Sequence, residues 1–257
     1  MRKIFLLLAL LAAQQAATAQ NLNFYGFLPS YSQTGLISKK FDYNFFASAT
    51  YSAFDRSFGG LDYPAKLLQV YVQPSLIYKH SPNLNFSVSF TYNYQRNNSR
   101  ALYFSEYRPW QQVVYSHAFS KIKGRMSHRL RFEQRLIKTK TDSVRRLTTR
   151  LRYQIGYMIP LQGKTLDAHE FYLNMYNEFY FSLSTPPAPR LRSAFYSENW
   201  TYLGIGFNTG KMGRIEVGPL YQGTYRSPKV GHQHNRRNLS MLQVLWVTNF
   251  NPPKKKK

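Results

Sequence analysis

The sequence contains no cysteine. This absence excludes a disulfide framework, thiolate metal ligands and cysteine nucleophiles, and it fits an exported bacterial protein. Acidic residues are also scarce, because 11 Asp and Glu stand against 35 Lys and Arg. After the N-terminal segment there is no apolar run of about 18 residues, which excludes membrane-spanning helices. No glycine loop of the phosphate-binding type is present.

The net charge of +24 is a second feature of the composition, and it indicates which class of partner the protein could face. Removing Arg2, Lys3 and the four lysines from Lys254 to Lys257 leaves +18 on the rest of the chain. A charge of this size is typical of nucleic-acid binding. The arginines are spread through alternating segments, however, rather than gathered on a helix or tail. This distribution favours an envelope protein that faces polyanions over a nucleic-acid binder.

The first 19 residues have the three parts of a signal peptide. Arg2 and Lys3 form a positive start, residues 4–13 a short apolar core, and Ala17-Thr18-Ala19 a small-x-small cleavage site. We therefore expect export and cleavage before Gln20. Residues 20–40 are predicted to be a periplasmic N-terminal lead-in with at most one short strand.

The stretch 85–95 sets the expectation for the fold. Its even positions, from Phe86 to Tyr94, are all apolar or aromatic, and its odd positions are small or polar. Because side chains alternate across a strand, this is a strand with one apolar and one polar face. The polar face carries hydroxyls and amides, and the apolar face ends in tyrosines, which favour the boundary between lipid tails and headgroups. This combination is typical of a membrane-spanning barrel strand.

Similar alternation recurs over residues 41–250. We predict an all-β fold: a single transmembrane antiparallel up-and-down β-barrel of about ten strands, or twelve, after the cleaved signal peptide. With an even strand count, the first strand begins and the last strand ends on the periplasmic side. Phe250 is the aromatic residue expected near the end of the last strand, and residues 251–257 form a basic C-terminal tail. The predicted strands are residues 41–51, 66–79, 85–95, 108–119, 125–137, 145–159, 170–183, 193–208, 211–225 and 238–250.

Charged residues share the polar faces of several of these strands. At mid-depth in lipid each arginine would cost about 2–4 kcal/mol, so we assign these faces to the barrel interior. A hairpin centred near Lys140 would set Arg131 opposite Arg150 and Arg135 opposite Arg146, and such like-charge pairs need carboxylates, water or anions between them. The predicted luminal charge network consists of Arg129, Arg131, Glu133, Arg135, Arg146, Arg150, Arg152, Glu178, Glu198, Arg214 and Glu216.

Two functions compete for this network. It is either a salt-bridge network that fills and holds a narrow barrel, or the lining of a narrow conduit that prefers anions. A third alternative is an outer-membrane lipid hydrolase, for which His117 and His128 are the candidates, with Ser116, Ser127 and Glu133 near them in sequence. No Gly-x-Ser-x-Gly motif supports it, so we predict no enzymatic activity. His232 and His234 lack a carboxylate beside them, and neither a metal nor a cofactor is predicted.

The expected location is the outer membrane of a Gram-negative bacterium. The expected partners are outer-membrane lipid and lipopolysaccharide, and the barrel-assembly machinery during insertion, but no nucleic acid. Tyrosines near the longer connections are predicted to form a girdle at the membrane boundary. These tyrosines are Tyr63, Tyr103, Tyr107, Tyr180, Tyr196 and Tyr225.

Several segments resemble a known family. They are the hexapeptide from Glu106 to Gln111, the Arg/Glu-rich stretch from His128 to Arg135, residues 150–153, residues 197–207 and Glu216-Val217-Gly218. Together they are similar to the uncharacterised "domain of unknown function 2490" family, over roughly residues 41–250. The resemblance implies an outer-membrane barrel of Gram-negative bacteria, often of the Bacteroidetes. It implies no particular activity.

Overall fold

The computed structural model describes residues 21–58, 61–97, 102–119, 123–139, 144–184, 193–226 and 236–250. The predicted signal peptide and the basic tail lie outside these residues. Regular structure in the described part consists of β-strands. Across this part of the chain, no helix has the length and apolar character needed to span a membrane.

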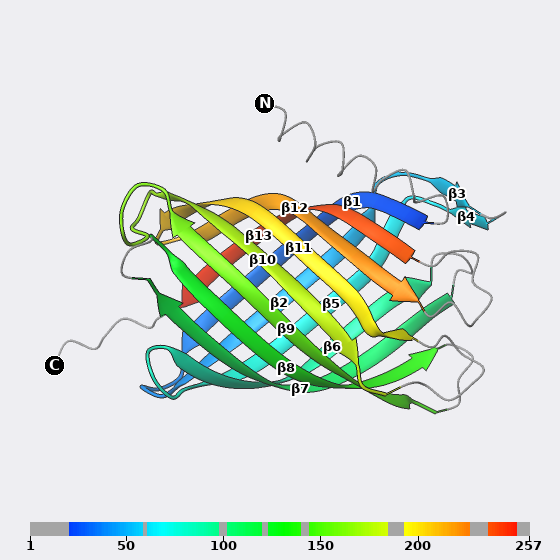
Figure 1. Ribbon diagram of the computed structural model, residues 1–257, viewed down its shortest axis with the longest axis horizontal. Coiled ribbons are helices and arrows are strands. Elements are labelled where there is room, and N and C mark those ends of the chain that lie inside the picture. The colour runs from blue at the N-terminus through cyan, green and yellow to red at the C-terminus, as the bar shows by residue number, and fades with distance from the viewer. Residues whose placement is uncertain are drawn as a thin grey trace, which may run out of the picture.

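Eleven of the strands form one closed barrel, in the order β1-β13-β12-β11-β10-β9-β8-β7-β6-β5-β2. Figure 1 shows the strands crossing the barrel obliquely, with the small β3–β4 hairpin beyond one end. The barrel strands are β1 (Asn21–Leu36), β2 (Phe41–Ser52), β5 (Lys66–Lys79), β6 (Leu84–Asn97), β7 (Leu102–Ala118), β8 (Arg125–Thr139), β9 (Arg146–Pro160), β10 (Phe171–Ser182), β11 (Ser193–Gly210), β12 (Gly213–Arg226) and β13 (Arg236–Phe250).

The closed all-β barrel is confirmed, but the predicted count of about ten strands is wrong. The ten strands predicted from residue 41 onward are all present, and β1 adds an eleventh. Residues 21–36 therefore belong to the barrel wall instead of forming a lead-in with at most one short strand. The connection after β2 also contains a small hairpin, β3 (Arg56–Phe58) paired with β4 (Leu61–Tyr63).

The odd count determines how the barrel closes. When neighbouring strands alternate in direction, the first and last of eleven strands run the same way, so β1 and β13 pair in parallel. Their register runs without interruption from Asn21↔Arg236 to Gly35↔Phe250. A parallel pair is slightly less stable per residue than an antiparallel one, and the length of this seam offsets that weakness.

The barrel has two distinct ends, which we name by their connections. The loop end carries the connections β2–β5, β6–β7, β8–β9, β10–β11 and β12–β13, and the turn end carries the others. At the turn end, β11 and β12 are joined by two residues flanked by Gly210 and Gly213, both with positive φ. Because β1 is parallel to β13, β1 starts at the loop end while β13 finishes at the turn end. The prediction that the first strand begins and the last strand ends on the same side of the barrel is therefore wrong.

Apolar side chains fill the lumen on the side of β1, β12 and β13. Tyr63 of the β3–β4 hairpin is 4% exposed and its ring lies 5.7 Å from that of Phe24, edge to face. Leu22, Leu68 and Leu239 complete this cluster near the loop end. The hairpin thus contributes a tyrosine to the barrel core, which explains why the β2–β5 connection contains regular structure.

Glycines on β11 make room for large rings in the lumen. A Cβ at Gly206 would lie 2.2 Å from the ring of Tyr172, and one at Gly204 would lie 2.1 Å from the hydroxyl of Tyr202. Both tyrosines are buried. The absence of side chains at these two positions therefore permits the inward packing of the tyrosines.

Candidate functional site

The centre of the charged interior is a single carboxylate, Glu133 on β8, which is fully buried. Arg150, its register partner on β9, contacts Glu133 Oε2 through Nη2 at 2.7 Å and Nε at 2.9 Å. Arg152 donates from Nη1 to Glu133 Oε1 at 2.7 Å. Arg108 of β7 has its Nη1 3.8 Å from the same oxygen. One carboxylate thus balances cations from two neighbouring strands.

A second buried carboxylate, Glu106 on β7, extends the network along the wall. Arg108 donates to it at 2.8 Å, and Arg135 of β8 binds it through Nε at 2.6 Å and Nη2 at 3.0 Å. Asn93 of β6 also contacts it, at 3.5 Å. Charged hydrogen bonds of this kind are stronger than neutral ones and fix the two guanidinium groups in place.

Glu178 on β10 and Glu198 on β11 close the network on its other side. Arg152 forms a two-point contact with Glu178, with both distances 2.8 Å, and Arg129 donates to Glu178 at 2.7 Å. Arg150 contacts Glu198 at 3.1 Å. Ion pairs therefore connect four neighbouring strands, β8 to β11, and the network reaches β7 through Glu106.

Aromatic rings lie against four of these guanidinium groups, of which Arg108 is the most distant, with its Cζ 5.6 Å from the centre of the Tyr71 ring. The Cζ of Arg131 is 3.9 Å from the centre of the Trp110 ring, and those of Arg150 and Arg152 are 4.7 and 4.5 Å from the Tyr180 ring. Each such contact between a desolvated cation and a ring contributes about 2 kcal/mol. The rings thus stabilise buried cations that exceed the carboxylates in number.

Arg131 is the cation with the least carboxylate contact. Its nearest carboxylate oxygen belongs to Glu133, at 3.9 Å. Its donors instead contact amide oxygens, Gln112 Oε1 at 2.7 and 2.8 Å and Gln73 Oε1 at 3.2 Å. Because six arginines share four glutamates, the network carries an excess of two positive charges. The six arginines are Arg108, Arg129, Arg131, Arg135, Arg150 and Arg152.

The structure brings most, but not all, of the predicted charge network together. Arg214 and Glu216 lie on β12, where Glu216 accepts hydrogen bonds from Tyr172 at 2.7 Å and Asn174 at 2.8 Å. Arg146 begins β9, and its register partner is Ile137. Ion pairs to Glu106, Glu133, Glu178 or Glu198 join Arg129, Arg131, Arg135, Arg150 and Arg152 of the predicted set into one network.

The predicted register of the β8–β9 hairpin is wrong by two residues. Arg131 lies opposite Arg152, and Glu133 lies opposite Arg150. Arg135 faces Thr148 rather than Arg146. The observed register replaces one of the two expected like-charge pairs with an ion pair. A shift by two residues keeps every side chain on its face, so the alternation alone did not fix the register.

Sequence reasoning missed two members of the network, Glu106 and Arg108. Glu106 lies in the connection before the predicted strand 108–119, whereas β7 begins at Leu102. Both faces of the predicted strand mix aromatic and polar residues, so the pattern does not assign Arg108 to a face. The two charges are two residues apart and therefore share one face. That spacing, together with the rule that charges face the interior, would have placed both residues in the lumen.

Two of the six tyrosines predicted for the outer girdle face inward. Tyr63 packs on Phe24, and Tyr180 lies under two arginines with 1% exposure. By contrast, Tyr103 is 37% exposed on the outer face. Proximity to a strand end does not tell which face a tyrosine occupies.

The candidate hydrolase histidines lie together, with the rings of His117 and His128 stacked at 5.7 Å, but the serines face the other side of the wall. His128 bonds the hydroxyl of Tyr153 on the outer face, at 2.8 Å. Ser127 is its neighbour on β8 and so faces the lumen, against Gly156. Glu133 is bound within the charge network. His232 and His234 lie outside the described residues, and within those residues no group of three His, Asp or Glu could hold a metal.

A cavity of about 250 Å³ lies in the lumen beside the network. One wall carries Arg129, Arg131, Arg152 and Glu178, and the opposite wall carries apolar residues of β1, β12 and β13 together with the amides of Gln222 and Gln243. The apolar residues of the opposite wall are Leu28, Leu220, Met241 and Leu245.

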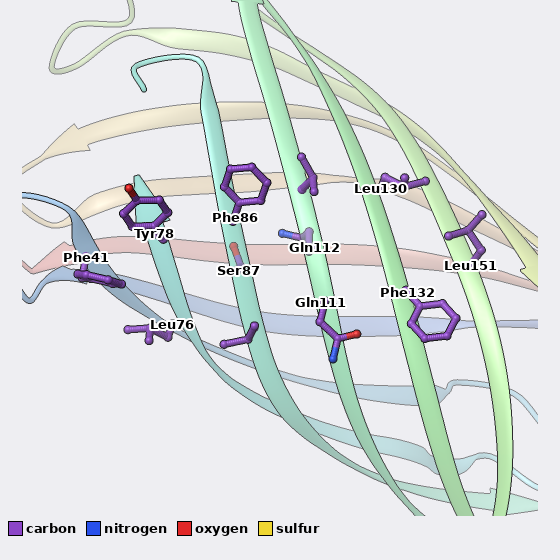
Figure 2. A pocket seen from close by; sticks show the side chains of 12 residues that line it. Phe41, Leu76, Tyr78, Phe86, Ser87, Gln111, Gln112, Leu130, Phe132 and Leu151 are labelled. Carbon is purple, nitrogen blue, oxygen red and sulfur yellow. The ribbon is translucent and has the colours of Figure 1, made fainter. Parts of the chain in front are cut away.

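A second hollow, of about 480 Å³, lies on the outside of the barrel. Figure 2 shows rings of Phe41, Tyr78 and Phe86 and the side chains of Leu76 and Leu130 spread over the outer face of neighbouring strands. This groove is almost wholly apolar. It belongs to the outer surface and not to the charged interior.

The fold and this interior define the class: a closed all-β barrel, apolar outside and charged within. A family model described as "Protein of unknown function (DUF2490)" matches residues 26–233, and the chain belongs to this family. The match begins within β1 and extends past β12. It confirms the family suggested by the sequence. No curated protein and no solved structure matches the chain.

Proposed function

We propose that this protein is an outer-membrane β-barrel of a Gram-negative bacterium with a structural role in the envelope, its lumen closed by the charge network. The observation that carries the proposal is the bare apolar outer face. Each of the eleven barrel strands contributes at least one large apolar side chain that is 36% exposed or more. Apolar exposure on this scale is costly in water and favourable against lipid tails.

Strand length supports the same location. The shortest barrel strands have 12 residues. At about 3.3 Å per residue and a tilt of about 40°, such a strand crosses about 30 Å, the thickness of a hydrocarbon core. Lipid and lipopolysaccharide would then be the partners of the outer face, and the assembly machinery would act during insertion. Bacterial single-chain barrels usually have an even number of strands, so eleven is a departure from the type.

Labelling of single cysteines on intact cells tests the location, because the native chain has none. Val144→Cys lies at the loop end, 68% exposed, and Met212→Cys lies at the turn end, 65% exposed. Outer-membrane barrels have short periplasmic turns and longer extracellular loops, so we place the loop end outside the cell. A maleimide too large to enter the periplasm should then label Val144→Cys on intact cells and Met212→Cys only after lysis. Labelling of both variants on intact cells, or of neither variant until the cells are lysed, would contradict the proposed orientation across the outer membrane.

A narrow pore that prefers anions is the second candidate, favoured by the positive excess of the network. Planar-bilayer recording separates the two functions. With the lumen crossed by ion pairs and an apolar cluster, we expect purified protein to leave the bilayer non-conducting at high loading. Steady anion-selective steps would refute the closed lumen and establish the pore. Loss of such steps in Arg131→Gln would then assign the selectivity.

A further inference from the structure

The luminal cavity has the composition of a binding site for one class of ligand. Its charged wall presents three arginines and one glutamate, a formal excess of two positive charges. Its opposite wall carries an apolar patch of Leu28, Leu220, Met241 and Leu245, interrupted by the amides of Gln222 and Gln243. We propose that this cavity binds a small amphipathic monocarboxylate, with the carboxylate on the arginine wall and the apolar body against β12 and β13. The inference goes beyond the envelope role and does not depend on the membrane location.

Arg129 is the residue placed to receive the carboxylate. Its Nη2 donates to Glu178, but its Nε is buried and has no hydrogen-bond partner. Its side chain is 26% exposed, more than that of Arg131 or Arg152. The cavity therefore borders the exposed part of the Arg129 side chain. The Nε is closed to solvent, so a carboxylate reaches this costly unpaired donor only if neighbouring side chains shift.

The neighbouring charges leave this position electropositive. Glu178 is already bound at two points by Arg152, so it neutralises Arg129 only in part. Arg131 holds amide oxygens of Gln112 and Gln73 rather than a carboxylate. An incoming carboxylate would supply the anion that the cavity wall lacks, without displacing an existing ion pair.

Size and apolar lining limit the ligand. A dry apolar cavity of about 150 Å³ is enough to hold benzene. At about 250 Å³, this cavity accommodates a body of that size together with a carboxylate. Leu220, Met241 and Leu245 provide the apolar contacts. Trp200 also lines the cavity and serves as an optical reporter of occupancy.

The test is a titration of purified, folded protein with benzoate, followed by calorimetry and by tryptophan fluorescence. Formate has the charge without the apolar body, and benzyl alcohol has the body without the charge. We expect saturable benzoate binding, with both comparators weaker by about tenfold or more. No saturable benzoate binding, or equal binding of formate, would overturn the proposal.

Two variants assign the site. Arg129→Gln should weaken benzoate binding by about tenfold or more, and Glu178 keeps Arg152 as its partner. Arg135→Gln is the matched control, because Arg135 also shares its carboxylate with a second arginine and is similarly exposed, at 22%, but does not line the cavity. Leu245→Phe fills the cavity without touching the charges and should also reduce binding. Unchanged affinity in either Arg129→Gln or Leu245→Phe contradicts the assignment, whatever the labelling experiment gives on location.

Discussion

Glu133→Gln is expected to destabilise the barrel more than any other single change in the charge network. The substitution keeps the shape but removes the negative charge within 4 Å of four arginines, Arg108, Arg131, Arg150 and Arg152. Removing one partner of a buried ion pair costs about 3–5 kcal/mol, because it leaves an uncompensated buried charge. Urea unfolding of the refolded protein, followed by tryptophan fluorescence, measures the loss.

Two variants show whether charge balance is the cause. Glu198→Gln should cost much less, because Glu198 is 18% exposed and Arg150 keeps Glu133. The double variant Glu133→Gln with Arg150→Met should recover part of the loss, because Arg152 keeps Glu178 and Arg108 keeps Glu106. If Glu133→Gln unfolds at the wild-type urea concentration, the network does not hold the barrel together.

Leu203→Arg is expected to destabilise the barrel in a bilayer by about 2–4 kcal/mol, the cost of an arginine at the membrane midplane. Leu203 is 52% exposed on the outer face, in the central part of β11. The measurement is unfolding of protein that has been folded into lipid vesicles. A soluble barrel would behave differently, since exposed surface substitutions usually change stability by less than about 0.5 kcal/mol.

Leu147→Arg is the matched control for depth. Leu147 is similarly exposed, at 59%, but is the second residue of β9 and lies near the loop end. An arginine near the membrane boundary costs about 0–1 kcal/mol. A large loss of stability for Leu203→Arg, with a small loss for Leu147→Arg, supports a lipid-facing band around the middle of the barrel. Equal effects at the two positions would contradict it.

The alternation of side chains allowed much of the interior to be predicted. Residues 125–137 place their arginines and Glu133 on one face and their leucines on the other, as β8 does. This works because a strand has a period of two, and because charge is too costly on an apolar face. The same rule does not assign Arg108, because both faces of the predicted strand 108–119 are mixed, and it does not reach Glu106, because β7 begins six residues before that strand.

The strand that closes the barrel gave no such signal. In β1, Leu22, Phe24 and Leu28 face the apolar core, while Tyr25 and Phe27 lie on the exposed outer face. Both faces are apolar at this end of the strand, so polarity does not alternate. The strand pairs with its chain neighbour β2 on one side and with β13, more than two hundred residues away in the chain, on the other. The side-chain pattern within β1 does not indicate a partner so far away in the chain.

The alternation along the chain assigns each charged residue of strands β8 to β10 to one face, because the pleat of a single strand fixes that choice. Which of these charges meet depends on how the strands pair in space. A two-residue shift in the β8–β9 register set Glu133 opposite Arg150 and left all faces unchanged. The tertiary structure also decided the strand count and the parallel closure, because both depend on the pairing of the two ends of the chain. The luminal cavity depends on the same closure, since β1 and β13 supply part of the apolar wall opposite the arginines.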